Sequence, residues 1–213
     1  MSSAPRKGRS VPGDRVDCLP RWSISSWRNA WVILEGAYPD ELRDIMAVLG
    51  HFTLSDDDMT SSGGSKSAPA RRLDSGFYDL GWVERKFDIR FVVDGEVNDV
   101  PTHKIDCYRN KVGLEIEWNN KDTFYDRDLN NFRLLYDLGV LDVGIIVTRC
   151  PSLNATIKRL GRWAKYGAPT TTTKKLWPKL LSGGGGGCPI VVCAIGNDLV
   201  ESSQTVMYLE ECP

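Results

Sequence analysis

Apolar and polar side chains alternate along residues 87–93, which is the pattern of a β-strand. The Asp94-Gly95 pair that follows is a strong hairpin turn signal. Two more strands are predicted over residues 102–108 and 112–118, with a short turn between them. We therefore expect neighbouring antiparallel strands in the middle of the chain.

Helical periodicity replaces the strand pattern after these strands. Residues 122–138 place apolar side chains near helical spacing, and Gly139 stands where a glycine commonly ends a helix. Residues 140–148 then form an apolar, β-branched run that predicts a buried strand. A strand, a helix and a strand with short joints predict a right-handed crossover between parallel strands.

Further elements are predicted on both sides of this unit. The spacing of apolar residues predicts helices over residues 34–49 and 152–166, and an apolar run predicts a second buried strand over 189–196. The Ser/Gly-rich residues near 60–70 and the five-glycine tract at 183–187 predict loops. Together these elements predict an α/β fold with a central mixed β-sheet flanked by helices.

Composition changes the picture little at the level of domains. Residues 1–20 are polar and rich in Ser, Pro and Arg, so we expect a flexible N-terminal arm, followed by a single domain over residues 21–213. The hydrophobic share of 41% is enough to bury a sizeable core. Because no apolar run is long enough to span a bilayer, we expect a soluble, cytoplasmic protein without a membrane partner.

The charge is balanced overall but uneven along the chain. The formal net charge is −1, yet residues 141–190 contain eight Lys or Arg against one acid. A locally basic stretch either faces phosphate or is simply a solvated helix face, and the sequence leaves both open. The six cysteines show no CxxC pair, which argues against a zinc site, and the glycine tract lacks the Lys-Ser/Thr of a P-loop.

Candidate chemistry is concentrated on the two central strands. Glu115 and Glu117 are two residues apart, so their side chains share one strand face. Antiparallel pairing across the short turn brings Asp106 beside Glu115. Three clustered carboxylates repel one another, and a bound divalent cation resolves that repulsion. Spacing alone favours carboxylates on a solvated sheet face, since any half-exposed strand shows this alternation.

The residues around these acids carry a family resemblance. Residues 104–120, which read KIDCYRNKVGLEIEWNN, resemble the catalytic segment of type II restriction endonucleases of the BglII and BstYI group, within the PD-(D/E)xK nuclease superfamily. The likeness covers roughly residues 76–198. It implies a restriction-endonuclease-like core in which Asp106, Glu115 and Glu117 are the catalytic and metal-binding residues.

Two positions depart from the superfamily pattern. Ile105 replaces a frequent proline. Glu117 stands where the wider superfamily usually has a lysine and the most similar members have a glutamine, and the BamHI enzyme also has a glutamate there. A lysine would stabilise transition-state charge, whereas a carboxylate accepts a proton from the attacking water or completes a metal site. The resemblance therefore implies hydrolysis that depends strongly on Mg²⁺, with Mn²⁺ as a substitute. Glu84, slightly upstream, is either a fourth catalytic acid or a surface acid.

The resemblance also implies how DNA is recognised. Asn119 and Asn120 follow the third catalytic position, where the family approaches bases in the major groove, and Lys121 would contact a phosphate. An Asn–adenine pair contributes about 1–3 kcal/mol of discrimination, although two asparagines after a strand also commonly form a turn. The partner that the resemblance implies is double-stranded DNA.

A palindromic DNA site implies a homodimer, because each subunit cuts one strand. The helix after residue 120 is the dimer element by resemblance, with Tyr125, Asn131 and Arg133 as exposed-looking contacts. A cognate DNA methyltransferase is the implied genetic partner. The function indicated is a type II site-specific deoxyribonuclease of a restriction-modification system. Two alternatives are a structure-selective or repair nuclease with the same core and a non-catalytic DNA-binding protein.

Overall fold

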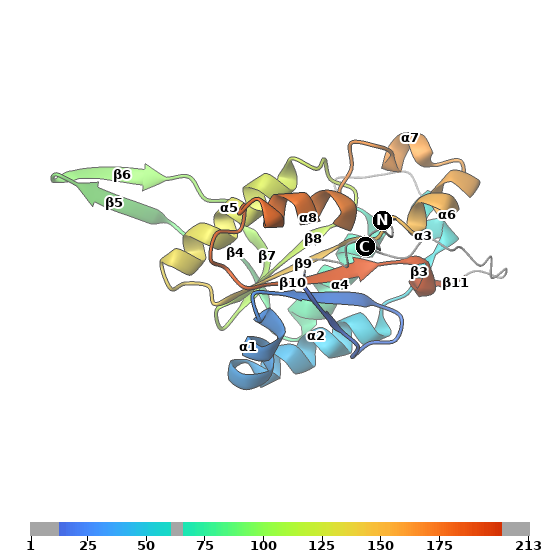
Figure 1. Cartoon of the computed structure of the whole chain (residues 1–213), viewed down its shortest axis with the longest axis horizontal. Coiled ribbons are helices and arrows are strands. Elements are labelled where there is room, and N and C mark those ends of the chain that lie inside the picture. The colour runs from blue at the N-terminus through green and yellow to red at the C-terminus, as the bar shows by residue number, and fades with distance from the viewer. Residues whose placement is uncertain (1–12, 61–65, 202–213) are drawn as a thin grey trace, which may run out of the picture.

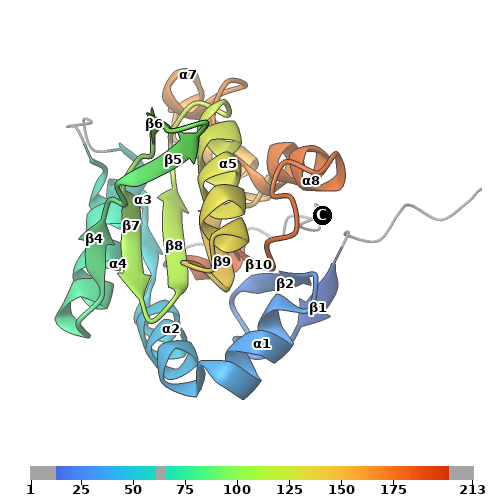
Figure 2. The ribbon, with the colours of Figure 1, turned by 90° about the vertical axis from the view of Figure 1, so that its left-hand side faces the viewer.

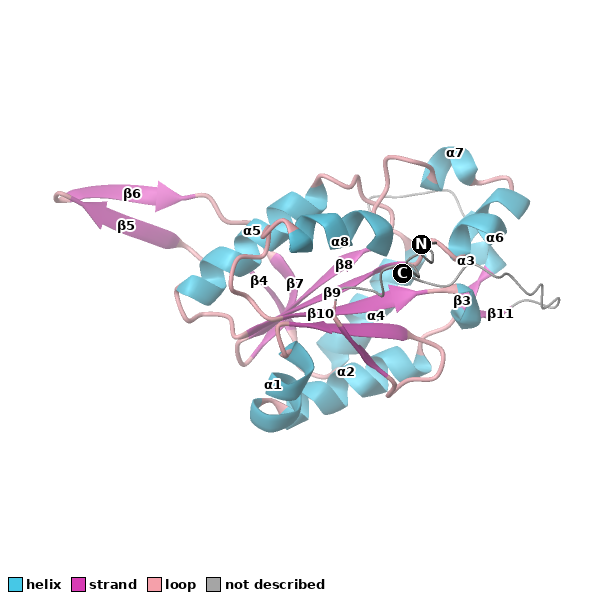
Figure 3. Cartoon of the chain, in the orientation of Figure 1, coloured by secondary structure: helices cyan, strands magenta, loops and turns pink. Residues whose placement is uncertain are grey.

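A seven-stranded mixed sheet forms the centre of the computed structural model, which describes residues 13–60 and 66–201 (Figures 1 and 3). In spatial order its strands are β1 (Asp14–Val16), β2 (Ser23–Trp27), β10 (Ile190–Ile195), β9 (Val143–Arg149), β8 (Val112–Glu117), β7 (Ile105–Arg109) and β4 (Val83–Arg85). Strands β8, β9 and β10 pair in parallel, and the outer pairs are antiparallel. The predicted α/β fold with a mixed sheet is confirmed.

Helices cover both faces of the sheet (Figures 1 and 2). One face packs against α1 (Ala30–Ala37), α2 (Pro39–His51) and α4 (Ala68–Asp79). The other face packs against α5 (Phe124–Asp137) and α8 (Thr173–Leu181). The predicted crossover is confirmed in its order, because α5 joins the parallel strands β8 and β9.

Shorter elements lie around these layers. They are α3 (Asp56–Thr60), α6 (Leu153–Arg159), α7 (Trp163–Tyr166), a 3₁₀ turn (Asn197–Leu199), the two-stranded sheet of β3 (Leu54–Ser55) with β11 (Val200–Glu201), and the hairpin of β5 (Ile89–Val93) with β6 (Glu96–Val100).

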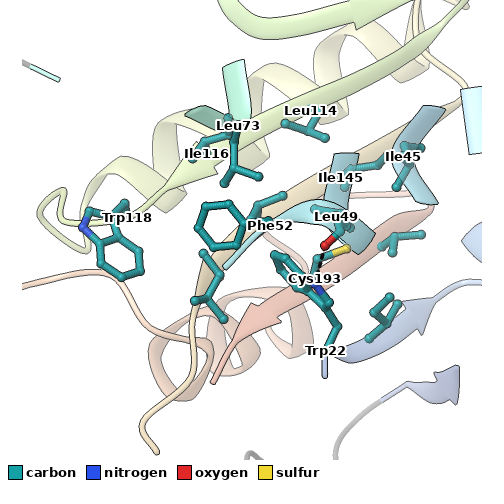
Figure 4. Close-up of a cluster of buried hydrophobic side chains, with 14 of the residues drawn as sticks. Trp22, Ile45, Leu49, Phe52, Leu73, Leu114, Ile116, Trp118, Ile145 and Cys193 are labelled. Atoms are coloured by element: carbon teal, nitrogen blue, oxygen red, sulfur yellow. Dashed lines mark hydrogen bonds between the residues drawn. The ribbon is translucent and has the colours of Figure 1, made fainter. Parts of the chain in front are cut away.

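Strand β8 is buried on both faces, so both its apolar and its acidic side chains lie inside the protein. Leu114 and Ile116 face the core under α1, α2 and α4, where they belong to the same cluster as Ile45 and Leu49 (Figure 4). In this core Trp22 Nε1 donates a hydrogen bond to the Leu49 carbonyl at 2.9 Å. Because Leu114 and Ile116 take one face, the glutamates between and beyond them take the face under α5.

Gly144 of β9 allows α5 to approach the sheet closely. A Cβ at this position would lie 2.5 Å from Cδ2 of Phe132, a buried residue of α5. Only a glycine leaves room for that ring, so the side chains of α5 come within reach of the carboxylates on β8.

Two predicted helices are each divided in the structure. Residues 34–49 belong to α1 and α2, because Pro39 starts a new helix and Tyr38 leaves helical geometry between them. Residues 152–166 belong to α6 and α7, which are separated at Gly161, where φ is +68°. None of the helices in the described ranges combines the length and apolar character needed to cross a bilayer.

The predicted loops are partly wrong. Residues 60–70 include the first turn of α4, whose N-cap Ser67 accepts a hydrogen bond from the Ala70 backbone, while residues 61–65 lie outside the described ranges. The glycine tract forms turns outside any helix or strand, as predicted, and it is closely packed, because a Cβ at Gly186 would lie 2.5 Å from Arg133 Cγ. Within the predicted N-terminal arm, β1 joins the sheet as its edge strand, and residues 1–12 lie outside the described ranges.

The hairpin predicted around Asp94-Gly95 is confirmed, but it stands apart from the main sheet. Its strands β5 and β6 pair only with each other in the described chain and project from the body (Figures 1 and 2). Asp94 and Gly95 have φ values of 51° and 86°, as a hairpin turn with two left-handed residues requires. Strand β5 is therefore mostly exposed.

The surface of α5 also differs from the expectation. Tyr125 and Asn131, which we expected to be exposed, are buried against the sheet. Tyr125 Oη lies 2.6 Å from Thr148 Oγ1, so its polar end is satisfied inside the core. Of the three predicted contact residues, Arg133 is exposed.

Candidate active site

The hairpin of β7 and β8 brings Asp106 to Glu115, as the sequence predicts. Its register pairs Cys107 with Leu114, so Asp106 lies one residue further along, opposite Glu115. At this end the ladder gives way to a side-chain contact, in which the Ile116 amide donates to Asp106 Oδ2 at 2.9 Å. This bond fixes the orientation of the Asp106 carboxylate beside β8.

Glu115 and Glu117 are buried under α5, with exposed fractions of 2% and 1%. They are therefore not the solvated carboxylates that spacing alone would have allowed. Burial, followed by the charge of Asp128, raises the pKa of Glu115 well above its usual range. The same causes raise the pKa of Glu117 to about 10. A nearby cation would be needed to hold both groups ionised at neutral pH.

Asp128 of α5 is a fourth carboxylate in this cluster, and its side chain is fully buried. Arg127 Nε and Nη2 donate to Asp128 Oδ1 at 3.0 and 2.9 Å, and Nη2 lies 3.9 Å from Glu117 Oε1. His103 approaches from the segment before β7, with Nε2 3.2 Å from Asp128 Oδ1 and 3.6 Å from Glu115 Oε1. Sequence analysis assigned neither residue to the site: Asp128 lies on α5, and His103, although inside the strand predicted over residues 102–108, precedes β7 in the structure.

Asp74 of α4 is a further acid that the sequence did not indicate. Lys66 forms ion pairs with Asp74 and, at 3.6 Å, with Asp106 Oδ1. Burial raises the pKa of Asp74 to about 6 although Lys66 opposes that rise. Burial lowers the pKa of Lys66, but the hydrogen bond to Asp74 and the charges of Asp106 and Asp74 outweigh burial and raise that pKa to about 12. Lys66 thus shares its positive charge between two carboxylates.

Glu84, which the sequence analysis gave as a fourth catalytic acid or a surface acid, lies outside the buried carboxylate cluster. It lies on the exposed strand β4, and its Oε2 accepts a hydrogen bond from Lys104 Nζ at 2.6 Å. The acid that shares a cation with Asp106 is Asp74. Helical spacing around residue 74 would have been the available signal, but we assigned the start of α4 to a loop.

Asn119, Asn120 and Lys121 follow directly after β8, and a threonine-rich segment holds them. The Asn120 carbonyl accepts from the Thr171 amide at 2.9 Å, and Lys121 forms a bridge with Thr170. The Asn120 side chain lies near Glu117 and lowers the pKa of that carboxyl. Both asparagines are half-buried and Lys121 is exposed, so the segment lies between the carboxylate cluster and the surface.

Arg149, one of the eight basic residues between 141 and 190, is buried rather than on the surface. Its Nε donates to the Trp118 carbonyl at 2.8 Å, and its Nη2 donates to Thr170 Oγ1 at 2.5 Å. This arginine therefore connects the end of β8 to the threonine-rich segment. At this position the basic stretch contributes a buried side chain and not a surface charge.

Comparison with known proteins agrees with the architecture. The family model described as restriction endonuclease BglII/BglIII matches residues 22–195, which is most of the chain and includes all seven predicted site residues. No curated protein sequence matches the chain. By this match the chain belongs to the BglII family of restriction endonucleases, and it is a type II restriction endonuclease, a hydrolase.

Proposed function

We propose that this endonuclease cleaves both strands of a short palindromic DNA sequence in a Mg²⁺-dependent reaction. The observation that carries the proposal is the burial of Glu115 and Glu117 beside Asp106. A bound cation would hold these buried carboxylates ionised, and a phosphodiester substrate is itself an anion that such a cation would attract.

The donors at this position fit Mg²⁺. Asp106, Glu115 and Glu117 offer carboxylate oxygens, the hard ligands that Mg²⁺ prefers together with water and substrate phosphate oxygens. Mn²⁺ accepts the same donors and is the expected substitute. When bound, such an ion lowers the pKa of a coordinated water and neutralises charge on the leaving oxygen.

Residues of the chain supply the remaining functions. Asp106 is held in place by the Ile116 amide. Without a cation, burial raises the pKa of Glu117 to about 10, so the group is protonated at neutral pH. A bound cation would hold it ionised, and the carboxylate could then accept a proton from the attacking water. Lys66, near Asp106, brings the positive charge that Glu117 does not. Glu84 stays a candidate for a supporting acid through its ion pair with Lys104.

For recognition, we assign base contacts to Asn119 and Asn120 and a phosphate contact to Lys121. The proposal is supported by their place directly after β8, beside the carboxylate cluster. Twofold symmetry of the site calls for a homodimer, with one active site per strand. In a restriction-modification system the enzyme acts in the cytoplasm, and a cognate methyltransferase protects the host DNA.

The test is digestion of phage DNA with the purified protein and Mg²⁺, followed by sequencing of the ends. We expect discrete fragments with one common end sequence. Asp106→Ala and Glu115→Ala should abolish cleavage and keep DNA binding, whereas Glu96→Ala, a matched carboxylate removed from the exposed hairpin, should cleave normally. Cleavage that survives loss of Asp106 contradicts the assignment, and cutting restricted to branched or damaged DNA favours a repair nuclease.

A further inference from the structure

Three side chains from different parts of the chain converge next to Glu115 on the α5 side of the sheet. They are His103 from the segment before β7, Glu115 from β8 and Asp128 from α5. One ligand atom from each lies within 4.8 Å of the other two. His103 is also held to α5 through its carbonyl, which accepts a hydrogen bond from Asn131 at 3.5 Å.

The atoms at this point of convergence lack hydrogen-bond partners. His103 Nε2, Glu115 Oε1 and Asp128 Oδ2 are buried atoms without a partner among the described residues. The His103–Asp128 distance of 3.2 Å does not meet hydrogen-bond geometry. Buried carboxylate oxygens are costly when nothing donates to them, so the arrangement points to a ligand that accepts their lone pairs.

The local charge supports a cationic ligand. Three carboxylates, those of Glu115, Glu117 and Asp128, face one arginine, Arg127, whose side chain is 43% exposed. Both bonds from Arg127 to Asp128 go to Oδ1, which leaves Oδ2 available. A divalent cation would balance the remaining negative charge.

We infer that His103, Glu115 and Asp128 form a second divalent-cation site, adjacent to the Asp106 site and sharing Glu115 with it. An imidazole nitrogen with two carboxylates favours Mn²⁺, Co²⁺ or Zn²⁺ over Mg²⁺, because a nitrogen ligand suits these ions better. With a cation held at each of the two sites, the pair would attract and stabilise a substrate phosphate. The inference rests on the proposed function only through Glu115.

Pulsed electron paramagnetic resonance of the Mn²⁺-loaded protein tests the site directly, since it detects nitrogen bound to the ion. We expect nitrogen coupling in the wild type and its loss in His103→Gln. His51→Gln is the matched control, because the chain has two histidines and His51 lies exposed at the end of α2. Mn²⁺ binding at this site should weaken at least about tenfold in His103→Gln and in Asp128→Asn.

A second measurement uses only wild-type protein, so it still tests the site if a substitution impairs folding. Wild-type protein labelled with ¹⁵N-histidine should show the ¹⁵N pattern in place of ¹⁴N. Absence of nitrogen coupling in Mn²⁺-saturated wild type, or coupling that persists in His103→Gln, overturns the inference.

The proposed function fails separately from this site. Asp106→Ala should lose Mg²⁺-dependent cleavage while the histidine coupling persists. If Asp106→Ala still cleaves DNA, the catalytic assignment is wrong and the histidine site stands on its own result.

Discussion

Arg149 provides the most demanding test of how the site is held, because it is a buried cation that connects three segments. Its guanidinium donates to the Trp118 carbonyl at 2.8 Å, to Thr170 Oγ1 at 2.5 Å and to the Thr171 carbonyl at 3.2 Å. Burial lowers the pKa of Arg149 to about 10. We predict that Arg149→Met loosens the segment that carries Asn119 and Asn120 and destabilises the fold.

The magnitude follows from the acceptors that the substitution leaves. Each of three buried oxygens without a donor costs about 1–3 kcal/mol, or about 3–9 kcal/mol together. Removing the guanidinium also relieves its own desolvation, which offsets several kcal/mol. We therefore expect the free energy of unfolding to fall by about 2–4 kcal/mol in Arg149→Met.

Urea denaturation followed by circular dichroism measures the effect. Arg162→Met is the matched control, because Arg162 is exposed, and its unfolding free energy should change by less than about 0.5 kcal/mol. Arg149→Lys should not restore stability, since one ammonium cannot replace a planar group that reaches several acceptors. If Arg149→Met is as stable as the control, the bracing role is refuted.

Three further predictions concern packing, proton binding and recognition. Gly144→Ala should lower the free energy of unfolding by about 1–3 kcal/mol, because its Cβ would meet the Phe132 ring, and unchanged thermal melting would contradict that contact. The pKa of Glu117 is about 10 in the folded protein and 4.5 in an unfolded chain, so its stabilising contribution is complete below pH 4.5 and is lost as pH rises toward 10. Glu117→Gln should therefore flatten the fall in the free energy of unfolding with pH when the metal-free protein is denatured. An unaltered slope would argue against this pKa. Asn119→Ala and Asn120→Ala should each reduce discrimination between the cognate site and singly altered sites by about 1–3 kcal/mol in cleavage assays, and unchanged ratios would remove that residue from base reading.

The sequence by itself determined the part of the site that depends on neighbouring residues. On β8, the two-residue period of a strand places Glu115 and Glu117 on one face and Leu114 with Ile116 on the other. The short turn before β8 then pairs Asp106 with this strand. These relations follow from backbone geometry over a few residues, which the sequence pattern expresses directly.

Sequence alone did not determine whether the glutamate face of β8 is solvated or covered. An alternating strand has the same pattern whether its polar side meets water or a helix. The docking of α5 over that face, allowed by Gly144, buries Glu115 and Glu117 and changes their proton affinity. The number of Lys and Arg along residues 141–190 likewise contains no information on which of them are buried. Arg149 was therefore counted with the surface charges, although it is buried.

Only the tertiary structure brought the remaining side chains to the site. Asp74 reaches Asp106 through Lys66 from α4, and Asp128 and His103 reach Glu115 from α5 and from the segment before β7. Asp74 and Asp128 belong to no local motif with the two strands, and His103, although close to Asp106 in the sequence, meets Asp128 only because α5 packs over the sheet. Their convergence depends on how helices pack across a sheet, which is decided by side-chain volume and contact over the whole core, and no spacing along the chain encodes it.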